Sequence, residues 1–158
     1  MVISLLNHLN NPSMLEKNQT GIASEFYVAG ELSRLGYNVT VTFGNTKAID
    51  LLIQKDSGIY KVQVKGIQSR KSICWNIDKR KVTNDLYIVL VNLHVDEPSV
   101  KPEFFVLQGN EVKELFNDTN NEKRSWLDYN KIKRLDKYQD RWGVFGEPEV
   151  SDVNEEWH

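Results

Sequence analysis

The hydrophobic pattern first predicts one long helix. From Lys17 to Leu35 apolar side chains recur every three or four residues, and Gly36 follows at the place where a helix-ending residue is expected. Beyond it the pattern changes to strand-like segments, predicted at residues 38–44, 48–54, 60–66, 73–77, 86–93 and 104–107, with a short helix at 111–116. The chain is therefore predicted to be α/β in the broad sense (α+β), with a central mixed β-sheet flanked by helices.

The C-terminal part has a weaker pattern. The segment from Trp126 to Arg141 has helical spacing only in part. We interpret its neighbouring aromatic residues as core anchors rather than as platforms on which bases stack. These residues are Trp126, Trp142 and Phe145.

Length and composition indicate one domain. The chain has 158 residues, of which 40% are hydrophobic, and we expect a single domain over 1–146 and an acidic tail over 147–158. No apolar run approaches the ~20 residues that span a bilayer, and no signal peptide is recognisable. The one cysteine, Cys74, excludes an internal disulfide and a cysteine-rich zinc site. We therefore expect a cytoplasmic protein that has no membrane partner.

Charge is unevenly distributed along the chain. The net charge is −2, but the tail holds five acidic residues and no Lys or Arg, so the preceding body carries +3. Basic residues gather between positions 61 and 81, and they are candidates for contacts with nucleic-acid phosphates. The candidates are Lys61, Arg70, Lys71, Lys79, Arg80 and Lys81. The alternative is an ordinary solvated surface.

Glu25 is the first residue that does not fit a structural pattern. On a helical wheel it falls in the middle of the apolar arc, which contains Ile22, Phe26, Ala29, Leu32, Val28 and Leu35. A carboxylate facing the core is destabilising unless it is paired or binds a metal ion, so we expect a partner on the sheet beneath the helix. A salt-bridged glutamate that reaches the solvent is the alternative.

Polar side chains also share one face of the second and third predicted strands. Strand alternation places Gln63 and Lys65 together, and Asp50 projects to the same side from the neighbouring strand. If Ser57 and Gly58 form a two-residue turn, Asp50 lies directly across from Lys65. The alternative is a surface ion pair worth about 0–1 kcal/mol.

Together, Glu25, Asp50 and Gln63 indicate a divalent-metal site, and Lys65 places a positive charge beside it. Phosphodiester hydrolysis requires such a combination. Carboxylate and amide oxygens suit Mg²⁺, which polarises a phosphoryl oxygen and lowers the pKa of bound water. A nearby ammonium group stabilises the negative charge that develops in the transition state. The chain has no Gly-x-Ser-x-Gly elbow, no phosphate-binding glycine loop and no histidines at ligand spacing.

Three short motifs carry a resemblance to a known group of enzymes. Gly21-x-x-x-Glu25, Ala48-Ile49-Asp50 and Val62-Gln63-Val64-Lys65-Gly66 resemble the PD-(D/E)XK nuclease superfamily. The most similar members are those of the archaeal Holliday-junction-resolvase-like and small homing-endonuclease-like kinds, and the resemblance covers roughly residues 17–93. It implies a restriction-endonuclease-like core and cleavage of nucleic acid, usually DNA, with Mg²⁺ (or Mn²⁺).

The resemblance also implies roles for individual residues. Glu25 and Asp50 would be metal ligands, Gln63 would take the second acidic position, and Lys65 would be the catalytic lysine. Val64 is a further implied metal contact. Glutamine at position 63 removes one negative charge from the implied site. A homodimer is expected from family habit, because cutting two strands favours two symmetric sites.

Three functions follow from these observations. The first is a metal-dependent endonuclease, which we expect to act on DNA. The second is a catalytically lapsed nucleic-acid-binding or assembly module of the same fold. The third is a protein-interaction domain whose acidic tail is the working part. The choice between DNA and RNA, and the structure of the substrate, stay open at this point.

Overall fold

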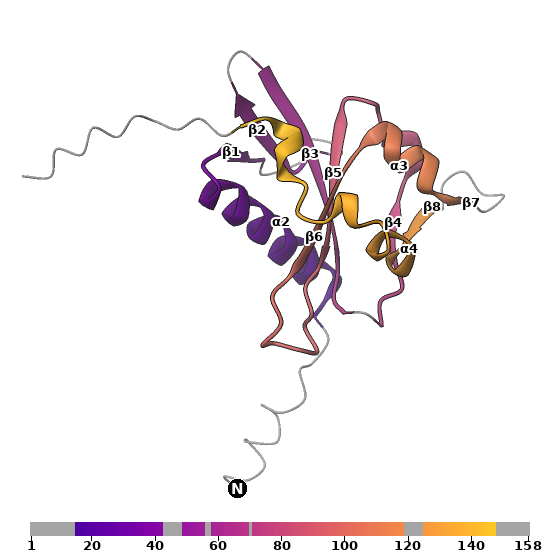
Figure 1. The fold of residues 1–158 in the computed structure, drawn as a ribbon. Helices are drawn as coiled ribbons and strands as arrows, with labels where there is room; N and C mark the ends of the chain where they lie inside the picture. The colour runs from indigo at the N-terminus through magenta and orange to yellow at the C-terminus, as the bar shows by residue number, and fades with distance from the viewer. Residues whose placement is uncertain (1–14, 43–48, 56–57, 70, 119–124, 148–158) are drawn as a thin grey trace, which may run out of the picture.

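The central element of the fold is a five-stranded sheet (Figure 1). The computed structural model describes residues 15–42, 49–55, 58–69, 71–118 and 125–147. The strand order is β1-β2-β3-β5-β6, with β1 at Asn38–Val41, β2 at Leu51–Lys55, β3 at Gly58–Ile67, β5 at Leu86–Asn92 and β6 at Glu103–Gln108. β3 and β5 run parallel, and the other neighbouring pairs are antiparallel. The predicted central mixed sheet is confirmed; the outer ends of the predicted strands, at 43–44 and 48, lie outside the described residues.

Helix α2 (Lys17–Arg34) covers one face of this sheet (Figure 1). It begins with a capping box, in which Glu16 and Gln19 bind each other's backbone N–H groups. Its chain leaves through Gly36, whose φ of 89° suits glycine. Val28 and Leu32 pack into a core that also contains apolar residues of β2, β3, β5 and β6. The helix predicted over 17–35 is therefore confirmed.

The buried face of α2 is rotated from the apolar arc that the sequence predicted. Ile22 and Phe26 are 54% and 55% exposed, whereas Thr20 and Ser24 are buried. The cause is the close approach of the helix to β3, because a Cβ added at Gly66 would lie 2.0 Å from the Ser24 Oγ. Small side chains are needed at this contact. The buried Ser24 hydroxyl has a hydrogen-bond partner there, because it donates to the carbonyl of Thr20 (2.7 Å).

The other face of the central sheet is covered by a second, smaller sheet and two short helices (Figure 1). The strand order of this sheet is β4-β8-β7, with β4 at Cys74–Ile77, β8 at Ser125–Asp128 and β7 at Asn117–Asp118. The helices are α3 (Gly109–Leu115) and α4 (Tyr129–Lys133). Short 3-10 turns lie between β4 and β5 at Lys79–Lys81, and after α4 at Asp136–Tyr138 and Trp142–Phe145. The hydrophobic pattern did not separate this sheet from the central one. The partial helical spacing noted between Trp126 and Arg141 corresponds to the short α4 and the 3-10 turn after it, whereas Trp126 itself lies on β8.

The C-terminal aromatic residues pack into the core. Trp142 and Phe145 are buried on the α2 side, as predicted, whereas Trp126 is half-buried. The Tyr37 hydroxyl donates to the carbonyls of Trp142 (3.1 Å) and Gly146 (2.7 Å) and ties this segment to the end of α2. The predicted acidic tail lies outside the described residues after position 147.

No helix in the described part of the chain has the length and apolar character needed to cross a membrane.

Candidate active site

A cleft of about 540 Å³ lies between α2, the second half of β3 and β4. It exists because β2 covers only the first half of β3: β2 pairs with Gly58–Val62, whereas β5 pairs with Lys61–Ile67. Beyond Val62, the β3 edge on the β2 side has no strand partner among the described residues. The cleft is lined by Lys17, Thr20, Gly21, Glu25, Asp50, Val64, Lys65, Gly66, Ile67, Gln68, Ser72, Cys74, Trp75 and Asn76.

Asp50 lies where β2 separates from β3. Its N–H donates to the carbonyl of Val62 (2.9 Å), and its own carbonyl accepts from the Thr42 N–H (2.9 Å). The Asp50 Oδ2 accepts a hydrogen bond of 2.6 Å from the Val64 N–H. The carboxylate thus takes the place of a neighbouring strand, and this bond holds it against β3 at the cleft.

The predicted register of this hairpin is wrong. Lys55 pairs with Gly58 and Leu51 with Val62, so Asp50 is not directly across from Lys65. The connection between the strands falls at positions 56–57, outside the described residues, and Gly58 belongs to the ladder. The pair Asp56-Ser57 has turn-forming residues just as Ser57-Gly58 does, so composition alone could not choose between these two positions for the turn. In the observed ladder each β2 residue pairs with a β3 residue two positions earlier than predicted. Because this difference is even, the polar residues stay on the predicted face.

Glu25 reaches the same cleft from α2, and its charge is coupled to those of Asp50 and Lys65. Burial raises the pKa of the Glu25 carboxyl; nearby Asp50 raises it further, and Lys65 lowers it. Burial also raises the pKa of Asp50, against the Val64 hydrogen bond and the Lys65 charge. Two carboxylates that repel each other therefore lie in a partly desolvated part of the cleft, with the Lys65 ammonium group beside them.

Gln63 lies on the same face of β3 as Lys65, and continuing the β2–β3 ladder by one position places it opposite Asp50. It is 7% exposed, it pairs with Ile88 of β5, and it is not among the side chains that line the cleft. Val64 does line the cleft, and its N–H is bound to Asp50. Of the positions implied by the resemblance, Glu25, Asp50, Val64 and Lys65 line the cleft, and Gln63 is buried at the adjacent position of β3 without lining it.

The residues in the cleft fit a hydrated Mg²⁺ ion. Within the described residues no three His, Cys, Asp or Glu side chains gather as a metal-binding group. Mg²⁺ does not require three, because it commonly binds through one or two carboxylates, several waters and the phosphate of a substrate. A cation between Glu25 and Asp50 would relieve the repulsion that raises the pKa of Glu25.

Three of the six basic residues predicted to contact nucleic acid, Lys61, Arg80 and Lys81, pair with acids in the described part of the chain. The Lys61 Nζ lies 3.0 Å from Asp85 Oδ2, outside the cleft. Arg80 makes two side-chain hydrogen bonds to Asp78 (2.9 and 2.8 Å) and lowers the pKa of that carboxyl to about 2.

The remaining members of that basic group are distributed as follows. Lys81 lies 4.0 Å from Asp78, Lys79 is half-buried in the 3-10 turn, Lys71 is exposed, and Arg70 lies outside the described residues. Such exposed pairs are worth about 0–1 kcal/mol, so a phosphate can displace them. A role in binding nucleic acid stays a prediction for these six residues.

Sequence reasoning missed part of the cleft. Gly21 belongs to a motif that carries the resemblance, but Lys17 was not predicted to line a site. Lys17, Gly21 and Glu25 are spaced four positions apart, which places them on one face of a helix, so a signal for Lys17 is present in the sequence. The opposite wall is formed by Ser72, Cys74 and Asn76. No local signal indicates that wall, because it depends on how β4 packs beside β3.

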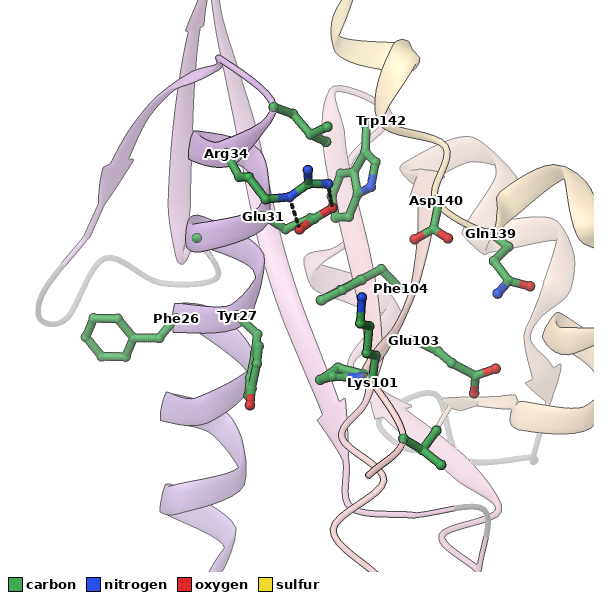
Figure 2. Close-up of a pocket in the computed structure, with 14 residues that line it drawn as sticks. Phe26, Tyr27, Glu31, Arg34, Lys101, Glu103, Phe104, Gln139, Asp140 and Trp142 are labelled. Atoms are coloured by element: carbon green, nitrogen blue, oxygen red, sulfur yellow. Dashed lines mark hydrogen bonds and ion pairs between the residues drawn. The ribbon is translucent and has the colours of Figure 1, made fainter. Parts of the chain in front are cut away.

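A second pocket, of about 1060 Å³, lies along the other half of α2, beside the segment that leads into β6 (Figure 2). Glu31 and Arg34 form an ion pair there (2.6 Å). The Glu103 carboxylate at this pocket is already bound by Lys133, by the Tyr129 hydroxyl (2.6 Å) and by the His94 Nε2 (2.9 Å). The pocket holds none of the residues predicted for chemistry, and Glu31 and Glu103 have protein partners.

Comparisons with known proteins agree on one group of enzymes. A family model described as PD-(D/E)XK endonuclease matches residues 15–100, more than half of the chain. Among curated proteins, none matches the sequence significantly.

Two solved structures share the fold. One is the bacterial homing endonuclease I-Ssp6803I, with a TM-score of 0.58 and 16% identity over 83% of this chain and 93% of that chain. The other is Hjc, a Holliday junction resolvase of Archaeoglobus fulgidus, with a TM-score of 0.53 and 12% identity over 83% of this chain and 98% of that chain. At these identities the likeness is one of fold, and it supports the restriction-endonuclease-like core.

Proposed function

This chain belongs to the PD-(D/E)XK endonuclease family, and from that premise we propose that it hydrolyses phosphodiester bonds of DNA with the help of a divalent metal ion. The observation that carries the proposal is the gathering of Glu25, Asp50 and Lys65 in one cleft, where β2 leaves β3. Each of the three comes from a different element, so local sequence alone does not bring them together. Two carboxylates beside one ammonium group are suited to holding a cation and a phosphate at the same place.

Each residue has a separate task in the proposed reaction. Glu25 and Asp50 would hold Mg²⁺ (or Mn²⁺), which when bound polarises the phosphate and makes water a stronger acid. The Lys65 ammonium donates to a non-bridging phosphate oxygen and stabilises the charge that grows as water attacks phosphorus and the ester oxygen leaves. The Val64 N–H keeps the Asp50 carboxylate oriented throughout.

Support for nucleic acid as the substrate comes from the family and from the two similar structures. One of those proteins is named a homing endonuclease and the other a Holliday junction resolvase. DNA is also the usual substrate that the sequence motifs imply. We expect a homodimer because two-strand cleavage favours two symmetric sites.

A catalytically lapsed DNA-binding module is the second candidate. The observation in its favour is that position 63 carries an uncharged side chain that does not line the cleft, which leaves two carboxylates there. A module of this kind would bind DNA without cutting it.

The test is cleavage of supercoiled plasmid, duplex, single-stranded, flap and four-way-junction DNA in Mg²⁺ or Mn²⁺, with EDTA as the blank. We expect metal-dependent cleavage of at least one substrate by the parent and none by Asp50→Asn. A salt-sensitive gel shift without cleavage by the parent would support the lapsed module. Cleavage that persists in EDTA would contradict the proposed metal dependence.

A further inference from the structure

Helix α2 contributes a stripe of three residues to the wall of the cleft. Lys17, Gly21 and Glu25 are four positions apart and all line it. Glu25 stands beside Asp50 and Lys65, whereas Lys17 begins the helix eight residues earlier, which is about 12 Å along the helix axis. The cleft therefore continues along α2, away from the residues proposed for hydrolysis.

Lys17 provides a positive charge at the far end of this stripe. It is exposed, and no ion pair or hydrogen bond joins its side chain to another described residue. The charges that shift the pKa of Glu25 are those of Asp50 and Lys65, so Lys17 stands apart from the carboxylates. Lys61, Arg80 and Lys81, by contrast, already have acidic partners.

Gly21 keeps the wall flat between the two ends. Glycine inside a helix is destabilising relative to alanine, so its presence calls for a reason. Close packing is not that reason, because a Cβ added at Gly21 would meet nothing within 4 Å, whereas one at Gly66 would collide with Ser24. The space beside Gly21 is open cleft, and its lack of a side chain leaves the helix backbone accessible there.

The charges along the cleft favour an anionic chain. Among the residues that line it, the acids are Glu25 and Asp50, both at one end, and the wall facing α2 offers neutral polar groups from Ser72 and Asn76. At the start of α2 the capping box engages the N–H groups of Glu16 and Gln19, and the Lys17 side chain supplies the positive charge at this end of the cleft.

We propose that Lys17 and Gly21 form a second phosphate subsite for the DNA strand that is cut. The sugar–phosphate backbone passes over Gly21, and the Lys17 ammonium binds a phosphodiester next to the one that lies beside Lys65. This inference rests on the proposed function. It assigns Lys17 to binding and positioning the strand, and it leaves the chemical step to the residues at the other end.

The first experiment measures binding of a fluorescein-labelled duplex and single strand in EDTA, over a range of salt concentrations. Lys17→Gln is expected to raise Kd about 3- to 10-fold at low salt and to reduce the slope of log K against log salt by about 1, because one phosphate contact is lost. The control is Lys101→Gln, an exposed lysine of the second pocket, for which we expect parental binding. In Mg²⁺, Lys17→Gln should raise KM while single-turnover cleavage at saturating enzyme stays near the parental rate.

The second experiment compares two helical glycines. Gly21→Leu and Gly30→Leu both replace a glycine of α2 whose added Cβ meets nothing within 4 Å, so each should preserve or raise Tm. Gly30 lines the second pocket and not the cleft. Only Gly21→Leu should therefore weaken DNA binding, by about 10-fold or more, because its side chain fills the path of the strand.

The outcomes separate the subsite from the proposed function. Parental affinity and salt slope for Lys17→Gln, or parental affinity for a folded Gly21→Leu, overturn the subsite while the parent still cleaves DNA. Equal losses for Gly21→Leu and Gly30→Leu also overturn it. A parent that neither binds nor cleaves DNA overturns both inferences. If Gly21→Leu does not fold, as shown by its Tm, the salt slope of Lys17→Gln decides alone.

Discussion

At the scale of single residues, the hydrogen bond from the Val64 N–H to Asp50 Oδ2 determines how the cleft is arranged. The donor belongs to the backbone of a sheet strand, so its position is set by the fold rather than by a mobile side chain. The carboxylate is thereby held in place despite the burial that raises the pKa of Asp50. A group held in this way loses little freedom when it binds a cation, which is what a proposed metal ligand needs.

Asp50→Asn should abolish cleavage and leave DNA binding equal or stronger. The amide oxygen still accepts from the Val64 N–H, so the fold is preserved, but the negative charge near the phosphate and the cation is gone. Single-turnover cleavage and binding anisotropy, measured on the same preparation, check both parts. Cleavage at the parental rate would show that the proposed metal ligand is elsewhere.

Lys65→Ala should slow cleavage by about 10²-fold or more with only a small loss of DNA affinity. The reason is that its ammonium acts on charge that develops mainly in the transition state. Single-turnover rates at saturating enzyme measure the effect, and Lys101→Ala outside the cleft serves as the control. A fall in affinity that accounts for the whole loss of cleavage would assign Lys65 to binding instead.

Gln63→Glu should lower Tm at neutral pH and lower it less near pH 4. Position 63 is buried, so a carboxylate there must either lose its hydration or stay protonated. Thermal melts of the parent and the variant at both pH values test this expectation. A raised Tm together with faster cleavage would instead show that position 63 reaches the metal site, as the sequence motif implied.

At the scale of elements, the distance between α2 and β3 is set by Gly66, Ser24 and Thr20. These small residues let the helix lie directly on the strand, at the point where the strand passes from Lys65 into the cleft. The close contact brings Glu25 of the helix into the same charged group as Asp50. A helix held further away would leave that carboxylate remote from the sheet.

Gly66→Ala should therefore destabilise the fold by roughly 1–3 kcal/mol, as overpacking usually does. The new Cβ would lie 2.0 Å from the Ser24 Oγ and 3.2 Å from the Thr20 carbonyl oxygen. Urea denaturation gives the free energy of unfolding, and Gly143→Ala is the control because its Cβ would meet nothing within 4 Å. Equal stability of Gly66→Ala and the parent would contradict the close packing.

At the scale of the whole molecule, Glu103 joins the two sheets. It lies on β6 of the central sheet and binds Lys133 and Tyr129 of α4, the helix that follows β8. The third group bound to the Glu103 carboxylate is the His94 Nε2, which follows β5. Burial by itself would raise the pKa of Glu103, but the hydrogen bonds from Lys133, Tyr129 and His94 hold it below its usual value.

This network predicts a loss of stability in acid. A carboxyl whose pKa is lower in the folded state stabilises the fold above its unfolded pKa, and this stability disappears as pH falls through the folded pKa. Between pH 6 and pH 3 the Tm of the parent should therefore fall more than that of Glu103→Gln. Thermal melts of the parent and Glu103→Gln between pH 6 and pH 3 test this difference in Tm. Glu114→Gln, which replaces an exposed acid of α3, is the control and should follow the parent. Parallel curves for Glu103→Gln and the parent would contradict it.

Periodicity in the sequence was sufficient to identify most of the strands, the polar and apolar faces of β3, and the charged residues that are candidates for chemistry. Periodicity reports the alternation of buried and exposed positions, and this is why α2 and β5 were predicted almost to their ends. The same period of two kept Asp50 and Lys65 on one side of the hairpin even though the predicted register was wrong.

What covers each face of the central sheet follows from long-range packing and not from the local pattern. The separate sheet of β4, β8 and β7 joins segments that are far apart in the chain. The exposure of Ile22 and Phe26 depends on how closely Ser24 approaches Gly66, and the opening of the cleft beside β3 depends on where β2 ends. A local pattern specifies that a side chain will be buried, but the partner that buries it, and the distance to that partner, follow from packing between distant segments.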